Sequence, residues 1–207
     1  LDLGRTVVEM RSGVEALGFI AVEDPIREDT PEAVRRLREM GVEVVMATGD
    51  NERTARSVAA RIGVDDYRAA LRPDDKLTLV RDWQARGRKV MMAGDGINDA
   101  AALKGADIGV AMGAGSDLAV ENADIVIVKG GVSRVADAIS LSRRIFEVIR
   151  QNLFWAFAYN VVAVPLAMLS LLNPIVAESA MAASSISVIL SSMRIAGHFG
   201  REDGEGA

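Results

Sequence analysis

The chain of 207 residues contains no cysteine and only one histidine. The absence of cysteine excludes disulfides and thiolate metal sites within this chain, and it leaves the redox compartment open. The net charge is −5, so nothing in the charge suggests a nucleic acid as a partner. The opening residues, LDLGRTVVEM, have no leading methionine and no basic stretch followed by an apolar core. We therefore expect neither a signal peptide nor a natural start there.

Charge is also nearly absent from the C-terminal region, where residues 151–193 contain one charged side chain, Glu178. This tract divides into two apolar runs, residues 153–172 and 175–196, joined by Asn173-Pro174. Each run has roughly the 20 residues that a helix needs to cross a bilayer. We expect a transmembrane α-helical hairpin. The alternative is a buried helical hairpin in a soluble core, but core helices rarely run this long without charge.

Arginines lie on one side of the predicted membrane pair: Arg143, Arg144, Arg150 and Arg194. An excess of arginine near the ends of membrane helices marks the cytoplasmic side. We therefore expect an integral protein of the plasma (inner) membrane, with the upstream domain and the tail 197–207 in the cytoplasm.

Upstream of residue 132, short apolar runs alternate with helical patterns. Apolar runs that lack alternation are typical of strands buried on both faces of a parallel sheet. Thr30-Pro31 is a good helix start, with a cap followed by proline in the first turn. The alternation predicts an open α/β sheet with right-handed crossovers. Within it, we expect 42–48, 89–93 and 108–112 to be neighbouring parallel strands, with Thr48, Lys76, Asp95 and Asp99 clustered at one end. The expected strands are 18–22, 42–48, 89–93, 108–112 and 125–128, and the other expected helices are 51–62 and 74–85.

Two further elements complete the prediction. Residues 6–10 and 18–22, separated by a turn at 11–13, are expected to form a strand pair that enters the domain. Residues 132–150 show apolar side chains at three- and four-residue steps, which predicts one long amphipathic helix leading to the membrane pair.

Polar motifs follow two of the apolar strands. Thr-Gly-Asp occupies residues 48–50, and Gly-Asp-Gly-Ile-Asn-Asp occupies residues 94–99. Open parallel sheets bind ligands beyond the carboxyl ends of their strands. Asp95 and Asp99, four residues apart, suit a magnesium site. The Thr48 hydroxyl can donate to a phosphoryl oxygen, and Lys76 can place its charge against the same phosphate.

Each motif also has a structural interpretation. Thr-Gly-Asp alone is a common strand-to-helix turn, with Asp50 or Asn51 as a helix cap. Lys76 alone would be a solvated surface lysine. The second motif after a buried strand is more specific, and the three segments in this order favour a phosphoryl-transfer site.

Together, these segments resemble the haloacid dehalogenase-type phosphorylation domain of P-type ATPases. Asp24-Pro25-Ile26-Arg27 and residues 99–113 are also similar to that family, and the resemblance extends from about residue 4 to residue 195. It implies a Rossmann-type parallel sheet, an aspartyl-phosphate intermediate, and ATP with Mg²⁺ as cofactors. The implied roles are Mg²⁺ binding by Asp95 with support from Asp99, phosphoryl contacts through Thr48, Gly49, Asp50, Lys76 and Asn98, and a nucleotide side formed by Asp24 and Arg27.

The predicted membrane pair resembles the copper-exporting, heavy-metal class of these pumps. The residues that carry this resemblance are Tyr159-Asn160 in the first run and a Met-x-x-Ser-Ser segment in the second. It implies a site for transported Cu(I), or Ag(I), formed by Tyr159, Asn160, Met181 and Ser185, with Ser184 beside them. A thioether suits Cu(I). Chemistry alone favours the alternative that Met181 is a packing residue and that the serines are small residues at a helix interface.

Several parts of such a pump do not occur in these residues. The Asp-Lys-Thr-Gly-Thr motif of the phosphorylated aspartate, the Cys-Pro-Cys of an earlier membrane helix and the actuator region are absent. The resemblance thus implies a fragment that is inactive alone and works with the missing N-terminal part, and it suggests a copper chaperone as a further partner. The alternatives are a non-catalytic half-pump and a phosphatase of the haloacid dehalogenase superfamily. The fragment would comprise the end of the nucleotide-binding domain with an entry strand (1–18), most of the second half of the phosphorylation domain (19–131), a linker helix (132–152), two membrane helices (153–196) and a tail (197–207).

Overall fold

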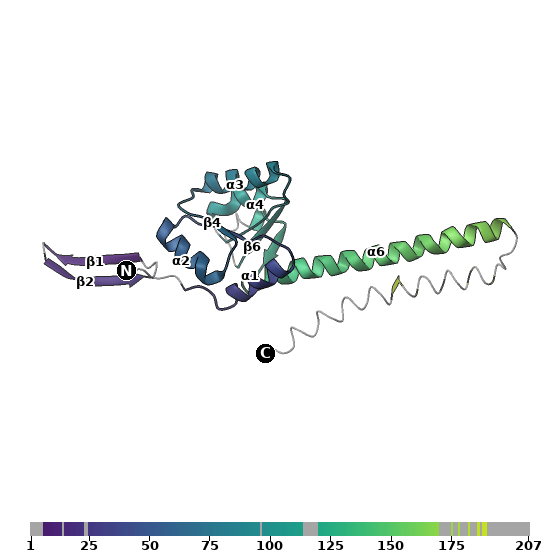
Figure 1. The fold of residues 1–207 in the computed structure, drawn as a ribbon, viewed down its shortest axis with the longest axis horizontal. Helices are drawn as coiled ribbons and strands as arrows, with labels where there is room; N and C mark the ends of the chain where they lie inside the picture. The colour runs from purple at the N-terminus through teal and green to yellow at the C-terminus, as the bar shows by residue number, and fades with distance from the viewer. Residues whose placement is uncertain are drawn as a thin grey trace. The chain divides into compact units, whose positions relative to one another are not determined.

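The computed structural model describes residues 6–13, 15–22, 25–95, 97–113 and 120–169, with six single positions between 175 and 189. The chain divides into two compact units, Leu1–Asp137 and Ala138–Ala207. Figure 1 shows the strands and short helices of the first unit and the long helix α6, which begins at Val132.

The first element is an antiparallel hairpin of β1 (Thr6–Ser12) and β2 (Glu15–Val22). The predicted strand pair is confirmed, and both strands are longer than the sequence pattern indicated. Gly13 lies between them with φ +63°, a left-handed conformation that glycine adopts at little cost. The chain reversal is therefore shorter than the turn predicted at residues 11–13.

The other strands are parallel, which confirms the α/β class. β3 (Val45–Ala47) pairs with β4 (Asp66–Arg68), and β5 (Met91–Gly94) pairs with β6 (Ile108–Met112). The strand β7 (Ile125–Ile127) lies on the other side of β6. β4 was not predicted, because its residues, Asp-Tyr-Arg, form no apolar run.

The prediction that segments 42–48 and 89–93 form neighbouring strands is wrong for this structure. β3 is hydrogen-bonded to β4 and β5 to β6, but no ladder joins β3 to β5 within the part of the chain that the structure describes. β3 and β5 are only partly buried, whereas β6, with a partner on each side, is buried at Val110 and Ala111. Each of β3 and β5 therefore has one edge without a strand partner among the described residues.

Helices follow the strands as the alternation predicts. They are α1 (Thr30–Glu39), α2 (Glu52–Ile62), α3 (Pro73–Ala85) and α4 (Ala100–Gly105), with a 3₁₀ turn at Ile97–Asp99 before α4. The predicted cap of α1 was one residue late. Asp29 is the N-cap, and its side chain makes no capping hydrogen bond to its own helix.

The first unit, Leu1–Asp137, is the sheet unit, and its core lies between α4 and β6. Leu103 and Val110 are each 1% exposed, and Ala102 and Ala111 are completely buried. A side chain at Gly109 would come within 2.6 Å of the Leu103 carbonyl oxygen, so glycine allows the helix to pack closely on the strand. This packing fixes the position of the loop between β5 and α4.

The long helix α6 (Val132–Met168) confirms the helix predicted at 132–150 and continues through the start of the first apolar run. Among the helices that the structure describes, none combines the length and apolarity needed to span a bilayer. Most of the second run, 175–196, lies outside the described residues, so the membrane hairpin stays a prediction.

Candidate active site

The Thr-Gly-Asp turn continues β3 by one hydrogen-bonded step. The Thr48 N–H donates to the Arg68 carbonyl at 2.9 Å, and the Thr48 carbonyl accepts from Leu71 N–H at 3.0 Å. The Thr48 hydroxyl donates to Asp50 Oδ2 at 3.0 Å and accepts from Asp50 N–H at 3.1 Å. Thr48 is half-buried and Asp50 is exposed, so the Asp50 side chain lies at the surface at the carboxyl end of β3.

The cap of α2 is Asn51 and not Asp50, the acid of this turn. Asn51 Oδ1 accepts from the N–H groups of Arg53 and Thr54, at 3.1 and 3.0 Å, and so caps α2. This is one of the two capping alternatives considered from the sequence. Asp50 is therefore not needed to cap α2, and the Thr48 hydroxyl donates to its carboxylate.

Lys76 is not a solvated surface lysine. Its Nζ lies 2.6 Å from Asp99 Oδ1, and the two side chains are only 14% and 11% exposed. Lys76 lies in the first turns of α3, and Asp99 ends the 3₁₀ turn after β5. The two residues are 23 positions apart in the sequence, and their contact joins α3 to the carboxyl end of β5.

Glycine at position 94 makes this pair possible. A Cβ on Gly94 would lie 2.7 Å from Asp99 Oδ2 and 2.9 Å from its Cγ, closer than real Cβ contacts. The absence of a side chain lets the Asp99 carboxylate lie against the end of β5. Gly94 therefore has a packing role.

The remaining polar residues of the second motif lie at the surface. Asp95 follows β5, and both Asp95 and Asn98 are exposed. A magnesium ion in a phosphoryl-transfer site uses one or two carboxylates, several waters and phosphate oxygens. Asp95, with Asp99 beside it in the motif, fits that donor set. No group of three or more acidic, histidine or cysteine side chains placed to hold a metal occurs among the described residues.

One loop links the ends of β3 and β5. After β4, the Ala70 N–H donates to the Asp50 carbonyl at 2.7 Å, and Leu71 bonds Thr48 as above. α3 begins two residues later, at Pro73, and Lys76 reaches Asp99. The contacts therefore run from the first motif through this loop to the second.

Ala70, whose N–H bonds the Asp50 carbonyl in this loop, was not predicted as part of the site. Its φ is +52°, and it is the one non-glycine residue with positive φ in the described chain. A left-handed conformation costs an alanine about 1–2 kcal/mol. The sequence contains no signal for this bend, because alanine is not a turn residue.

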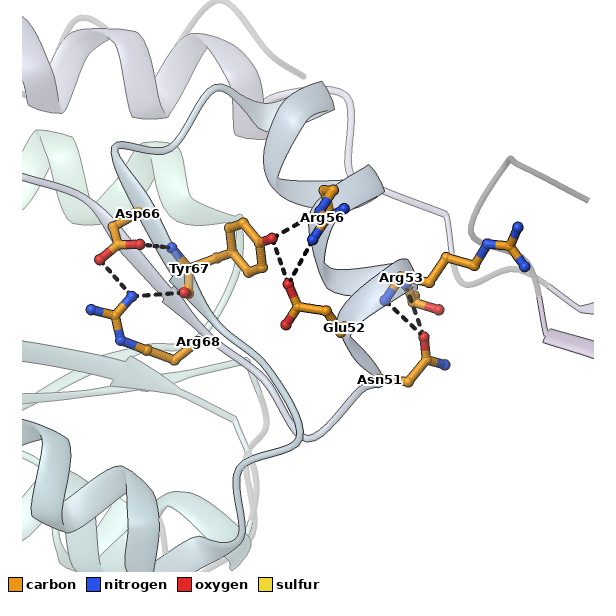
Figure 2. A network of polar contacts seen from close by, with 8 residues as sticks. Asn51, Glu52, Arg53, Arg56, Asp66, Tyr67 and Arg68 are labelled. Carbon is orange, nitrogen blue, oxygen red and sulfur yellow. Dashed lines mark hydrogen bonds and ion pairs between the residues drawn. The ribbon is translucent and has the colours of Figure 1, made fainter.

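A polar network beside the first motif holds α2 against β4 (Figure 2). The Tyr67 hydroxyl donates to Glu52 Oε1 at 2.8 Å and accepts from Arg56 Nε at 3.1 Å. Arg56 also bonds Glu52 at 3.2 Å. The hydrogen bond from Tyr67 lowers the pKa of Glu52 below its ordinary value. The network fixes the start of α2, which the first motif precedes.

Other predicted site residues are less fully described. Arg27 is exposed, with its Nε 3.7 Å from Asp29 Oδ1, and Asp24 lies outside the described residues. Asn160 lies in α6, and its Nδ2 donates to the Ala156 carbonyl at 3.0 Å. For Tyr159 the structure describes only the helical backbone, and Met181, Ser184 and Ser185 lie outside the described part. These roles stay predictions.

Comparison with known proteins identifies the family. Residues 1–107 match a family described as haloacid dehalogenase-like hydrolase, and residues 77–139 match a second family with the same description. The chain belongs to the haloacid dehalogenase-like hydrolases. The α/β fold with parallel strands described above agrees with this family.

Similar proteins within this family are heavy-metal P-type ATPases. A probable copper-exporting P-type ATPase V of Mycobacterium tuberculosis is 46% identical over 201 residues, 97% of this chain and 26% of the relative. A copper-exporting P-type ATPase of Bacillus subtilis is 45% identical over 93% of this chain and 24% of the relative. A probable copper-importing P-type ATPase A of Enterococcus hirae is 45% identical over 93% of this chain and 27% of the relative.

Solved structures agree with this assignment. A crystal structure of a zinc-transporting PIB-type ATPase in the E2.Pi state superposes with a TM-score of 0.84 at 34% identity, over 94% of this chain and 32% of that one. A catalytic domain of the CPx-ATPase CopB-B superposes with a TM-score of 0.51 at 26% identity, over 64% of this chain and 57% of that one. The resemblance to a segment of a heavy-metal P-type ATPase is confirmed. The chain spans about a quarter of the length of the curated relatives it matches.

Proposed function

We propose that this chain forms the part of a heavy-metal P-type pump that holds Mg²⁺ and the phosphoryl group, while the phosphorylated aspartate belongs to another part of the pump. The observation that supports this most directly is the Lys76–Asp99 pair of 2.6 Å at the carboxyl end of β5. The pair places a cation and two neighbouring acids, Asp99 and Asp95, at the edge where α/β sheets bind ligands.

In this proposal, each residue of the site has a distinct task. Mg²⁺, when bound, neutralises charge on the phosphoryl oxygens. Asp95 and Asp99 would hold the ion, and Asn98 would contact the phosphoryl group. Lys76 compensates the charge of Asp99 and adds a point charge close to the phosphate.

Residues of the first motif would act on the same group. The Thr48 hydroxyl, which donates to Asp50 in this structure, would turn to donate to a phosphoryl oxygen. Gly49 leaves space beside that oxygen. Asp24 and Arg27 would lie on the nucleotide side, where ATP supplies the phosphoryl group.

The unpaired edges of β3 and β5 suggest where the phosphorylated aspartate of the pump would lie. β3 and β5 each have one strand partner among the described residues, and both belong to parallel ladders. A parallel strand between them would satisfy both free edges and would end beside Thr48 and Asp95. We propose that the Asp-Lys-Thr-Gly-Thr segment of the pump follows such a strand, so this chain alone is inactive.

The transported ion in this proposal is Cu(I) or Ag(I), moved out of the cytoplasm. Tyr159, Asn160, Met181 and Ser185 offer neutral donors, including one thioether, which a soft monovalent ion accepts. Asn160 Nδ2 donates to the Ala156 carbonyl, so the Oδ1 of Asn160 is the atom that would bind the ion. Residues 153–196 would form two membrane helices of an integral protein of the plasma or inner membrane, and a copper chaperone would deliver the ion.

The test uses a full-length pump that contains this segment. We expect Asp95→Asn to abolish the acid-stable phosphoenzyme formed from ATP and Mg²⁺. The substitution removes the negative charge that binds the metal ion and leaves the side-chain volume nearly unchanged. Asp107→Asn is the matched control, since Asp107 lies just before β6 at the opposite end of the sheet and should leave labelling intact. Normal labelling of the Asp95 variant would remove the proposed role.

A further inference from the structure

The start of α6 lacks a cap of its own. The helix begins at Val132, directly after Gly131, which has no side-chain oxygen. The first N–H groups of a helix have no partner within the helix and need an acceptor from elsewhere. A helix without such an acceptor frays at its first turn.

Asp29 supplies the acceptor from another element. Its Oδ2 accepts the Ser133 hydroxyl at 2.6 Å across 104 residues of sequence. The hydrogen bond from the Ser133 hydroxyl, with a smaller contribution from the Ser133 backbone N–H, holds the pKa of Asp29 below its ordinary value. A negative charge at a helix N-terminus also interacts favourably with the helix dipole.

The backbone around Gly131 fits this carboxylate closely. A Cβ on Gly131 would lie 2.7 Å from Asp29 Oδ1 and closer still to Oδ2. Gly131 is also buried. The position therefore admits the Asp29 carboxylate only because it carries no side chain.

A second contact joins the same two helices. Arg36 Nη2 of α1 lies 2.8 Å from Asp137 Oδ1 of α6, and Arg134 lies 3.5 Å from the other oxygen of Asp137. Apolar side chains on both helices are buried, among them Val34 and Val135. The first turns of α6 are thus held to α1 at two points, within the unit Leu1–Asp137.

We propose that Asp29 is a positioning residue of the pump, which caps α6 from the start of α1 and so couples phosphorylation to ion movement. This inference rests on the proposed function. α6 is one continuous helix of 37 residues that leads into the first apolar run. A capped first turn transmits a displacement of the sheet unit to the helix, whereas a frayed turn absorbs it.

The first experiment measures the cap in the full-length pump by amide hydrogen exchange at Ser133. In Asp29→Ala, exchange at this amide should accelerate about fivefold, the effect expected for the loss of a helix cap. Asp29→Asn retains an acceptor and should keep the protection. Glu32→Gln, which alters an exposed ion pair on the same helix, is the control. Unchanged exchange in Asp29→Ala would overturn the capping role.

The second experiment measures metal ions transported per ATP hydrolysed, together with the phosphoenzyme level. Asp29→Ala should keep metal-dependent phosphorylation but lower the transport ratio at least about threefold, and Asp29→Asn should restore it. A merely structural role would reduce phosphoenzyme and transport in proportion and leave the ratio unchanged, which would overturn the inference. If the wild-type pump transports no metal ion, the proposed function itself fails.

Discussion

The ammonium nitrogen of Lys76 lies 2.6 Å from Oδ1 of Asp99, and both side chains are largely buried. The contact joins the first turns of α3 to the end of β5. It also brings the charge proposed to face the phosphate next to an acid of the proposed magnesium site. Another lysine–aspartate pair, Lys89 with Asp107 at 2.7 Å, has a 90% exposed lysine and lies at the opposite end of β5.

The two pairs give a matched comparison. Lys76→Met should destabilise the protein by about 3–5 kcal/mol, because it leaves the buried Asp99 carboxylate without a partner. It should also abolish phosphoenzyme formation in a full-length pump. Lys89→Met should change neither strongly, since exposed ion pairs contribute about 0–1 kcal/mol. Denaturant unfolding and labelling from ATP measure the two effects.

A double variant separates stability from chemistry. Lys76→Met with Asp99→Leu removes both charges and should regain most of the lost unfolding free energy. It should remain without phosphoenzyme. A double variant that recovered labelling along with stability would show that the pair is only structural.

Asp50 of the first motif and the next residue, Asn51, should behave differently. Asn51→Ala removes the cap of α2 and should cost about 0.5–2 kcal/mol of unfolding free energy while phosphoenzyme still forms. Asp50→Ala should leave stability nearly unchanged and reduce phosphoenzyme formation, since its carboxylate serves the Thr48 hydroxyl. The opposite outcome, with Asp50 stabilising and Asn51 needed for labelling, would reverse our assignment of these two residues.

The acid stability of the sheet unit should depend on Asp107. Hydrogen bonds from Lys89, Val90 N–H and Gln84 lower its pKa from 3.8 to about 2. A carboxyl group with a lowered pKa stabilises the fold above its ordinary pKa, and this contribution is lost as the pH falls from about 4 through 2. Asp107→Asn should therefore flatten the fall in unfolding free energy over that range. An unaltered pH profile in urea unfolding would contradict the assignment.

Much of this architecture could be predicted from local patterns, because β5, β6 and β7 are apolar runs and the helices carry recognisable starts. β4 could not, since a charged strand of three residues resembles a loop. The predicted adjacency of β3 and β5 was wrong: β3 pairs with β4 and β5 with β6, and strand order depends on the whole sheet rather than on any one apolar run. The mutual pairing of Lys76 with Asp99 depends on tertiary packing that no short pattern encodes.

The same reason explains why Asp29 was overlooked. The sequence pattern directed attention to Thr30-Pro31 as the start of α1, and Asp29 does precede that helix as its N-cap. Its side chain, however, bonds Ser133 rather than its own helix. Periodicity and capping rules describe neighbours in sequence, whereas this contact exists only after the sheet unit folds.

The assignment of copper depends on the predicted second membrane helix. Met181→Leu keeps volume and hydrophobicity but removes the sulfur, so it should weaken Cu(I)-stimulated ATPase activity in a full-length pump. Met168→Leu is the control, because Met168 lies at the end of α6 and is 81% exposed. If the Met181 variant kept full copper stimulation, or if Zn²⁺ rather than Cu(I) drove the pump, the copper assignment would be withdrawn.

The central claim is that this chain holds the phosphoryl group without supplying the aspartate that is phosphorylated. The most direct test labels a full-length pump containing this segment with γ-³²P-ATP and Mg²⁺ in acid-quenched reactions, and identifies the labelled peptide. We predict that the label lies outside residues 1–207, and that the purified 207-residue chain takes up none. Stoichiometric label on Asp50, Asp95 or any other aspartate of this chain would contradict the account.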